Sequence, residues 1–284
     1  MNIRTALDVS QRSVSFREAE IFLQHVLGVD RGYLHAHPET ELTEAQTAAY
    51  EQCLRRREAN EPVAYITGSK EFYGHPFKTD KRALIPRPET EALVTRALEI
   101  LDSRQGSQRI LEIGTGSGNI AVTLALELHD DTMIIATDVD PEAVALAGEN
   151  YALLSATQPA LPVRFLVANM FAHREIEANG PYDLVLANLP YVPDAWRFDA
   201  AAQPEVVFQE PALALFGGED GLDHYRAFFE KVASFAKPDA TILVEYGEDE
   251  TGDITDFVRG VMPSARLAVH KDYAGLDRLL EITL

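Results

Sequence analysis

After Gln108, short apolar runs alternate with segments of helical periodicity, and this alternation constrains the fold more than any other feature of the chain. Strand-length apolar runs lie near 109–113, 132–137, 163–167, 183–187 and 240–246, with helical patterns near 118–128, 141–153 and 223–236. Strands joined by helical crossovers pair in parallel and carry helices on both faces. Two final runs, 266–270 and 276–282, are separated by a short polar loop and predict an antiparallel pair at a sheet edge. The prediction is an α/β fold with a doubly wound, mostly parallel, seven-stranded sheet.

The first seventy residues carry helix signals instead. Ser15 and Glu18 are spaced as a capping box before an apolar helical stripe, and Gly28 follows that stripe as a stop signal. Thr43 and Gln46 repeat the capping arrangement at the start of a second helical segment. These signals predict a small helical module at the start of the chain.

Between Val63 and Pro86 the pattern becomes extended and aromatic, and glycine and proline interrupt it. Such a pattern is typical of a β-hairpin. Pro88 then opens another helix with an apolar stripe. The predicted domains are a helical domain at 1–70, a hairpin linker at 71–87 and a main domain at 88–284.

The charge balance argues against a general nucleic-acid binder. The chain has 25 Lys and Arg residues against 45 Asp and Glu residues, a net charge of −20, which repels a phosphate backbone. The cluster Arg55-Arg56-Arg57 is the main local exception. Because it falls late in a helical segment, where cations favour the helix dipole, we interpret it as a solvated helix end.

Length and composition also bound the class of protein. With 284 residues, 46% of them hydrophobic, the chain is long enough for one large domain and a small accessory one. Its single cysteine, Cys53, excludes an intrachain disulfide. The start shows no signal-peptide pattern, and no apolar run approaches the roughly 20 residues that span a bilayer. We therefore expect a cytoplasmic protein with no membrane segment.

A glycine loop, Gly114-Thr115-Gly116-Ser117-Gly118, joins the first strand of the alternating region to its helix. Small residues there let a ligand approach the backbone amides at the helix N-terminus. The spacing is tighter than the Gly-x-Gly-x-x-Gly of dinucleotide-binding proteins, and an acid, Glu112, precedes the first glycine by two residues. The loop predicts a nucleotide-like cofactor and favours S-adenosylmethionine over NAD.

Polar residues also follow the next two strands. Asp138 ends the second strand, where a carboxylate can accept both hydroxyls of an adenosine ribose, whereas the alternative role of helix N-cap fits Asp140 better. Asn169 and Met170 follow the third strand, where an amide can bond the adenine edge and Met170 or Phe171 can pack on its face. For Met170 and Phe171 an ordinary place in the core is an equally good interpretation.

The tetrapeptide Asn188-Leu189-Pro190-Tyr191 follows a buried apolar run, at the end of a strand where open α/β sheets bind ligands. Asn188 offers an amide oxygen, Pro190 holds Leu189 extended, and Tyr191 supplies a flat face. We interpret the loop as a clamp for a planar NH2-bearing group, either a carboxamide or an exocyclic base amine. A plain turn is the simpler alternative, which the upstream glycine loop disfavours.

Two other groups of residues invite a functional interpretation. Glu89 and Glu91 are spaced like paired catalytic carboxylates, but they also suit the first turn of the helix that opens at Pro88, and we expect helix-end and loop-organising roles. The eight histidines show no ligand spacing, so no metal site is predicted.

Together the glycine loop, Asp138 and the tetrapeptide Asn188 to Tyr191 resemble class I S-adenosylmethionine-dependent methyltransferases that act on an NH2 nitrogen. More narrowly, the chain resembles the protein-(glutamine-N5) methyltransferases that modify bacterial peptide chain release factors. The most specific motif is the octapeptide Leu84 to Glu91, whereas the tetrapeptide type is shared with adenine and cytosine amino-methyltransferases. Other matching segments are Glu61 to Gly68, Glu71 to Gly74, Glu210-Pro211, Ala214 to Leu222 and Lys271 to Arg278.

The resemblance implies that the helical module helps to bind the release factor and that Asn188 to Tyr191 hold the glutamine of its Gly-Gly-Gln motif. The Asn188 side-chain oxygen and the Leu189 carbonyl would accept the two amide hydrogens, and Tyr191 would stack on the amide plane. Leu189 stands where the family usually has proline, and Asn169 where it usually has aspartate. Direct nucleic-acid binding is not expected.

Three alternatives remain open from the sequence. The same clamp suits a ribosomal-protein glutamine, or a nucleic-acid base flipped into the site. The departures at Leu189 and Asn169 also leave open a protein that binds S-adenosylmethionine without turnover.

Overall fold

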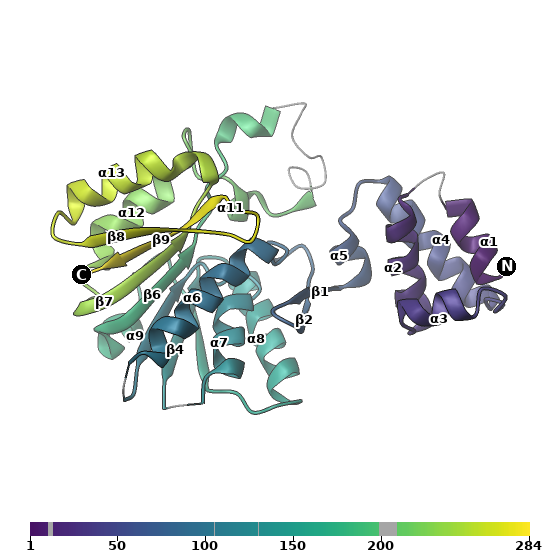
Figure 1. Cartoon of the computed structure of the whole chain (residues 1–284), viewed down its shortest axis with the longest axis horizontal. Helices are drawn as coiled ribbons and strands as arrows, with labels where there is room; N and C mark the ends of the chain where they lie inside the picture. Colours follow the sequence, from purple (N-terminus) through teal and green to yellow (C-terminus); the bar gives the residue numbers. More distant parts are fainter. Residues whose placement is uncertain (11–13, 105, 130, 199–208) are drawn as a thin grey trace. The chain divides into compact units, whose positions relative to one another are not determined.

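The computed structural model describes residues 1–10, 14–104, 106–129, 131–198 and 209–284 (Figure 1). The chain divides into two compact units, a smaller one at Met1–Ser69 and a larger one made mainly of the residues from Lys70 onward. Within the described ranges, no helix has both the length and the apolar content needed to cross a membrane.

The smaller unit is helical, as predicted. Its described residues form α1 (Ile3–Ser10), α2 (Phe16–Leu27), α3 (Arg31–Ala36), α4 (Glu44–Glu58) and α5 (Val63–Thr67). Both predicted capping boxes are present, Ser15 with Glu18 on α2 and Thr43 with Gln46 on α4. Gly28 ends α2 in the left-handed conformation, with φ 66°. The sequence predicts these features correctly because caps depend on residues only three positions apart.

The arginine cluster is used largely inside this unit. Arg56 binds both carboxylate oxygens of Glu61 at 2.7 Å and donates to two backbone carbonyls of α5. Arg57 pairs with Glu18 at 2.7 Å, and its side chain is only 16% exposed. The solvated helix end expected from the sequence is therefore wrong for these two arginines, which tie α4 to α5 and α2. Only Arg55, 64% exposed, fits that expectation.

The larger unit contains the predicted sheet. Its strands are β3 (Arg109–Ile113), β4 (Met133–Asp138), β5 (Val163–Val167), β6 (Tyr182–Asn188), β7 (Ala236–Glu245), β8 (Arg266–Lys271) and β9 (Asp277–Thr283). They lie in the order β5-β4-β3-β6-β7-β9-β8. The five strands from β5 to β7 in that order are parallel, and β9 runs antiparallel to both β7 and β8. The seven-stranded, mostly parallel sheet and its antiparallel pair are confirmed.

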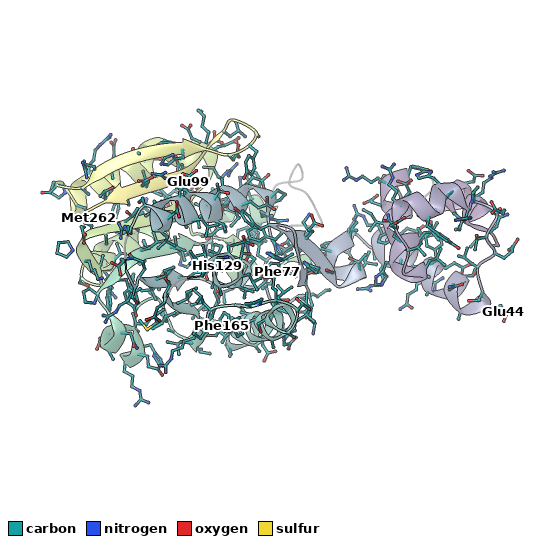
Figure 2. All side chains as sticks on the ribbon, turned by 60° about the horizontal axis from the view of Figure 1, so that its bottom comes forward. Glu44, Phe77, Glu99, His129, Phe165 and Met262 are labelled. Carbon is teal, nitrogen blue, oxygen red and sulfur yellow. The ribbon has the colours of Figure 1, made fainter. Side chains whose placement is uncertain are left out.

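Helices cover both faces of the sheet (Figure 1). One face carries α6 (Glu91–Asp102), α7 (Asn119–Glu127) and α8 (Pro141–Ser155); the other carries α9 (Arg174–Asn179), α12 (Asp223–Val232) and α13 (Thr251–Val261). Successive side chains of a strand point to opposite faces of the sheet, so they belong to different hydrophobic cores. Ile110 belongs to the core formed with α6 and α7, whereas Leu111 belongs to the core formed with α12 and α13. In Figure 2, Phe77 belongs to the first core and Met262 to the second.

A β-hairpin opens the larger unit, and it is shorter than the sequence suggests. Its strands are β1 (Ser69–Phe72) and β2 (His75–Lys78), and Phe72 and Phe77 meet edge to face with ring centroids 6.0 Å apart. The extended pattern predicted from Val63 onward is wrong for its first residues, which form α5 between Pro62 and the left-handed Gly68. Short segments remain at η1 (Pro88–Thr90), η2 (Asp194–Phe198), α11 (Ala212–Leu215) and η3 (Glu248–Glu250).

Candidate functional site

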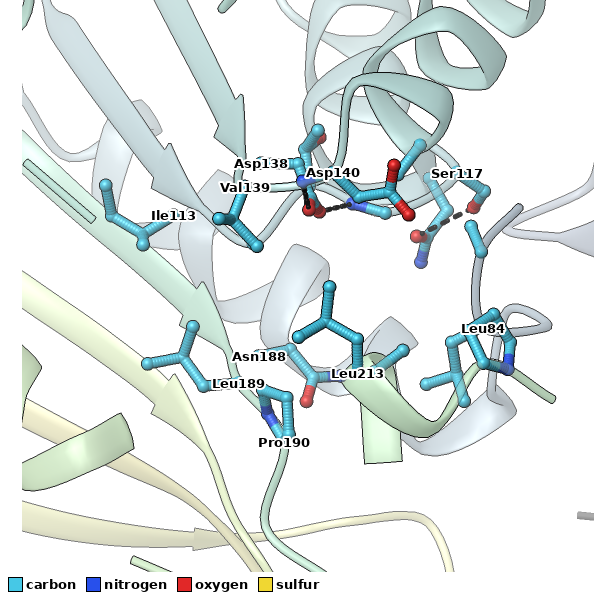
Figure 3. A pocket seen from close by; sticks show the side chains of 18 of the residues that line it. Leu84, Ile113, Ser117, Asp138, Val139, Asp140, Asn188, Leu189, Pro190 and Leu213 are labelled. Carbon is cyan, nitrogen blue, oxygen red and sulfur yellow. Dashed lines mark hydrogen bonds between the residues drawn. The ribbon is translucent and has the colours of Figure 1, made fainter. Parts of the chain in front are cut away.

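A cavity of about 310 Å³ lies in the larger unit at the carboxyl ends of β3, β4, β5 and β6 (Figure 3). It includes the point between β3 and β6 where the strand order reverses, which is where open α/β sheets bind ligands. Its walls come from segments far apart in sequence, which include 82–87, Thr90, 113–117, 119–120, 138–140, 168–170, 188–190, Pro211 and 213–214.

The glycine loop forms one wall of the cavity. Gly114 and Gly116 both have positive φ, 80° and 54°, a conformation that side chains with a Cβ rarely adopt. Gly118 also has positive φ, but it faces α8 instead of the cavity, and a Cβ there would lie 2.9 Å from that of Ala147. Thr115 and Ser117 line the cavity with the first two glycines.

Glu112 lies behind this loop and does not line the cavity. Its Oε2 accepts from the Thr115 hydroxyl at 2.8 Å and from the Ala121 backbone N–H at 3.1 Å, so it ties the loop to α7. Burial raises the pKa of this carboxyl to about 7. Glu112 therefore shapes the loop without reaching the cavity.

Asp138 lines the cavity at the end of β4. Its Oδ2 accepts from Gly116 N at 2.9 Å and its Oδ1 from Asp140 N at 3.0 Å, as Figure 3 shows. Each carboxylate oxygen has more than one lone pair, so acceptor capacity is left for hydroxyl groups. Asp140 caps α8 by accepting from Glu142 N, the role the sequence favoured for it.

Asn169 and Met170 both line the cavity, at the end of β5. Asn169 is exposed, and Met170 has φ 52°, an uncommon conformation for a residue with a side chain. Phe171 does not line the cavity; it is buried and stacks on Phe235 with ring centroids 4.6 Å apart. The sequence offers Met170 and Phe171 for packing on the face of an adenine ring, and of these two only Met170 lines the cavity.

Asn188, Leu189 and Pro190 form the wall opposite Asp138 (Figure 3). The Asn188 amide nitrogen donates to the hydroxyl of buried Thr90 at 3.2 Å. With its NH2 group held there, the other end of the amide, its oxygen, is the free acceptor. A Cβ on Gly114 would lie 3.1 Å from Leu189 Cδ2 and 3.5 Å from the Asn188 carbonyl oxygen, so this loop touches the glycine loop.

The backbone of Leu189 is held by Tyr225, a fully buried residue of α12. The Leu189 N–H donates to the Tyr225 hydroxyl at 3.1 Å, and the Leu189 carbonyl oxygen also lies 3.1 Å from that hydroxyl. The Tyr225 hydroxyl makes its shortest contact with the backbone carbonyl of Glu245. A phenol has one hydrogen to donate, so the Leu189 carbonyl keeps acceptor capacity for a ligand.

Tyr191 does not line the cavity. Burial raises its pKa, and its ring approaches Gly247, where a Cβ would lie 3.4 Å from Tyr191 Cδ2. Three of the four tetrapeptide residues thus meet at the cavity, and the ring expected to stack on a ligand packs behind it.

The octapeptide Leu84 to Glu91 forms a further wall and is anchored by two acids. Glu210, buried, accepts from Ile85 N at 3.0 Å and from Arg87 Nη2 at 2.6 Å. Glu91 accepts from the Tyr73 backbone N–H at 2.9 Å, the loop-organising role predicted for it.

Four further residues surround the tetrapeptide: Thr90, Glu210, Tyr225 and Glu245. Thr90 and Glu210 lie in segments that carry the resemblance, but the sequence assigns no site role to any of the four. Glu245 ends the apolar strand β7 just as Asp138 ends β4, so the same signal, a charge at a strand's carboxyl end, points to it. In the sequence, Tyr225 fits the apolar stripe of a helix, and no local pattern indicates that its hydroxyl has a role in the site.

Two family models match the chain. The model described as the PrmC N-terminal domain matches residues 3–68, and the model described as ribosomal protein L11 methyltransferase (PrmA) matches residues 88–190. These matches cover the helical unit and the part of the larger unit that contributes most of the cavity walls.

Curated relatives match nearly the full length. A release factor glutamine methyltransferase of Koribacter versatilis is 38% identical over 263 residues, which cover 92% of this chain and 89% of the relative. A release factor glutamine methyltransferase of Bradyrhizobium diazoefficiens is 36% identical over 287 residues, which cover 97% of this chain and 91% of the relative. Among solved structures, a methyltransferase from Pyrococcus furiosus superposes with TM-score 0.51 at 17% identity over 82% of this chain and 98% of its own, a likeness of fold alone.

Proposed function

The chain belongs to the release factor glutamine methyltransferase family, and we propose that its cavity brings S-adenosylmethionine together with the glutamine of a release factor's Gly-Gly-Gln motif. The protein is an S-adenosylmethionine-dependent methyltransferase that modifies the side-chain amide nitrogen of that glutamine. The observation that supports the proposed site most directly is the Asn188 amide, anchored by its nitrogen to Thr90 and lining the cavity.

The donor side of the cavity fits S-adenosylmethionine. Gly114 and Gly116 line the cavity without side chains, so a ligand can approach their backbone closely, and Asp138 offers carboxylate oxygens for the ribose hydroxyls. Asn169 and Met170 stand where an adenine edge and face would be met. In this assignment Glu112 and Gly118 support the cofactor by shaping the loop. When bound, S-adenosylmethionine supplies a methyl group activated by its sulfonium.

The acceptor side fits a carboxamide. A glutamine nitrogen is a poor nucleophile because its lone pair is delocalised into the carbonyl. The Asn188 side-chain oxygen and the Leu189 carbonyl would accept its two N–H groups and hold the lone pair in line with the methyl group. Pro190 restricts Leu189, and Tyr191 supports the loop from behind. Such orientation contributes on the order of 7–11 kcal/mol in favourable cases, and no strong base is required because the methylated nitrogen loses its proton readily.

We assign partner recognition to the helical domain at 1–70, with the hairpin at 71–87 as linker and the methyltransferase domain at 88–284. Support comes from the match of residues 3–68 to the PrmC N-terminal domain model. Arg56 and Arg57 are engaged inside the helical unit, so the cluster offers little to a nucleic acid. We place the reaction in the cytoplasm, where release factors act.

A nucleic-acid base is the second candidate for the clamp, because the tetrapeptide type is shared with amino-methyltransferases of bases. The net charge of −20 disfavours it. A ribosomal-protein glutamine would fit the same two acceptors, so it belongs in the assay as a competing substrate.

The test is intact-mass analysis of a purified release factor after incubation with the enzyme and S-adenosylmethionine. We expect one added methyl group, located by peptide mapping on the Gly-Gly-Gln glutamine. Asn188→Ala should abolish turnover while calorimetry shows nearly unchanged S-adenosylmethionine affinity.

The control is Asn179→Ala, which removes an α9 side chain that donates to the Glu175 carbonyl and does not line the cavity. It should keep wild-type turnover. A release factor that gains no methyl group, while a ribosomal protein or an RNA does, would redirect the assignment to that substrate.

A further inference from the structure

Glu245 is a buried acid placed directly beside the proposed substrate clamp. It ends β7, and its register partner on the neighbouring parallel strand is Asn188, which ends β6. Register partners on adjacent parallel strands point their side chains to the same face of the sheet. Glu245 does not line the cavity, so any effect on a bound substrate must pass through its neighbours.

The carboxylate of Glu245 is buried with little hydrogen bonding to offset the loss of water. The residue is 1% exposed, and in the part of the chain that the structure describes neither oxygen has a hydrogen bond of ordinary geometry. The Thr90 hydroxyl and the Asn188 amide are near enough to offset part of the effect of burial on its pKa. Burying a carboxyl in this way costs stability, and an apolar residue would fill the space without that cost.

The groups around Glu245 come from several elements. Arg278 of β9 favours its ionised form, and Glu89 of η1 opposes it. Tyr191 and Tyr225 also interact with it electrostatically. The net result is that burial raises the pKa of Glu245 to about 7, so the group changes charge near neutral pH.

The charge state of Glu245 determines which hydrogen bonds its carboxyl group can form with Thr90 and Asn188. An ionised carboxylate only accepts hydrogen bonds, so it attracts the Thr90 hydroxyl hydrogen and the Asn188 NH2 group. Thr90 Oγ1 already accepts from Asn188 Nδ2 at 3.2 Å, which leaves its own hydrogen free to point at Glu245. A protonated Glu245 carries a donor and stabilises the flipped amide, with the Asn188 oxygen turned inward and the NH2 group toward the cavity.

We propose that Glu245 is a positioning residue for methyl transfer: acting through Thr90 and Asn188, its carboxylate keeps the Asn188 amide oxygen turned toward the glutamine nitrogen. This inference rests on the proposed function, because it requires a substrate with an N–H to be accepted. A flipped Asn188 would present its own N–H groups to those of the glutamine, and the nitrogen would lose one of its two acceptors.

The test compares wild-type enzyme with Glu245→Gln in release-factor methylation from pH 5.5 to 8.5. Wild-type kcat should rise with pH through about 7 and then level off, because the ionised form holds the productive amide. Glu245→Gln, which presents a donor at every pH, should lower kcat on the order of 10- to 100-fold and abolish this acidic limb. S-adenosylmethionine affinity, measured by calorimetry, should change less than about twofold, because Glu245 does not line the cavity.

Three further variants keep the result interpretable. Glu250→Gln is the matched control, because burial also raises the pKa of Glu250 to about 7 but its carboxylate bonds Gly247 N instead; it should keep the acidic limb. Thr90→Val removes the hydroxyl group and should lower kcat as Glu245→Gln does. Thr90→Ser keeps the hydroxyl group and should retain the wild-type kcat. If Glu245→Gln fails to fold, the two Thr90 variants still test the positioning role of Glu245.

Two results would overturn the positioning role. One is full kcat with an unchanged acidic limb in Glu245→Gln, and the other is full kcat in Thr90→Val, each measured with an active wild type. A wild-type enzyme that methylates no release factor would instead refute the proposed function together with this inference, so the two failures are distinguishable.

Discussion

Tyr225 and Leu189 form a contact that depends on the identity of residue 189. The Leu189 N–H donates to the Tyr225 hydroxyl, which in turn donates to the Glu245 backbone carbonyl. A proline at this position, as the family usually has, carries no N–H and cannot make the first bond. Leucine thus gives up the rigidity of a proline ring and gains a hydrogen bond that fixes the same stretch of backbone.

We predict that Tyr225→Phe destabilises the protein by about 1–3 kcal/mol, because it removes the acceptor of the buried Leu189 N–H and the hydroxyl that donates to the Glu245 carbonyl. The same change should lower kcat, since the Leu189 carbonyl loses its support. Chemical denaturation and release-factor methylation measure the two effects.

Leu189→Pro makes the matched background for this prediction. It removes the N–H, so Tyr225→Phe should cost about 1 kcal/mol less in the proline background than in the wild type. Additive losses would show that the Leu189 N–H contributes nothing through Tyr225.

The site residues that the sequence predicted are those with a local signal. Asp138 and Asn188 each stand at the carboxyl end of an apolar run, and all three lining residues of the tetrapeptide follow from that position. Tyr191 faces away from the cavity because the backbone next to it packs against another loop, which no local pattern records. Thr90 lines the cavity and bonds Asn188, 98 positions away in sequence, a contact that no local pattern records.

The segment from α11 to α12 supports the tetrapeptide from behind. Val192 N donates to Leu215 O and Gly217 N to Val192 O, both at 2.9 Å, which forms an isolated parallel bridge between Val192 and Phe216. A Cβ on Gly217 would lie 2.5 Å from the Pro190 carbonyl oxygen and 2.2 Å from that of Gly221. Both contacts are with backbone, which has little freedom to move.

Gly217→Ala should therefore displace the Pro190 backbone and lower kcat/KM on the order of 100-fold, as small misplacements of catalytic groups do. Thermal unfolding and methylation assays measure this. Gly148→Ala is the matched control, because nothing lies within 4 Å of a Cβ there and the residue is inside α8. It should be active and more stable by up to about 1 kcal/mol. Equal activity in both variants would contradict the supporting role.

At the scale of elements, caps and periodicity predicted the helices that carry strong local signals, such as α2 and α4. At α5 the sequence predicts the wrong structure, because Val63 to Thr67 have the β-branched and aromatic character of strands. It is a single helical turn stabilised by the side chain of Arg56, whose guanidinium bonds two of its carbonyls. Tertiary contact overrides local preference there.

For the whole molecule, the alternation of strand and helix patterns predicted the sheet because each element's period is local. The order of the strands depends on contacts between distant segments, which one sequence does not reveal. The sheet buries two acids, which destabilises their ionised forms. Glu112 and Glu245 both lie at strand ends next to the cavity loops, and burial raises the pKa of each to about 7. Stability of the whole fold is therefore linked to pH through residues that shape the site.

Glu112 gives the sharper test of this linkage. Its folded pKa of about 7 lies above the ordinary value of 4.5, so its contribution to stability is fully present below pH 4.5 and is lost as pH rises through 7. Both of its donors bond one oxygen, Oε2, so Glu112→Gln keeps an acceptor for them while removing the titration. Between pH 5 and pH 8 the free energy of unfolding should therefore shift in favour of the variant, relative to wild type, by up to about 3 kcal/mol. Urea denaturation of the cofactor-free proteins at several pH values measures the shift, and Glu230→Gln, on the exposed side of α12, should follow the wild-type curve. Parallel curves for wild type and Glu112→Gln would mean that Glu112 remains ionised in the folded protein, and the glycine loop would then be shaped around a buried charge.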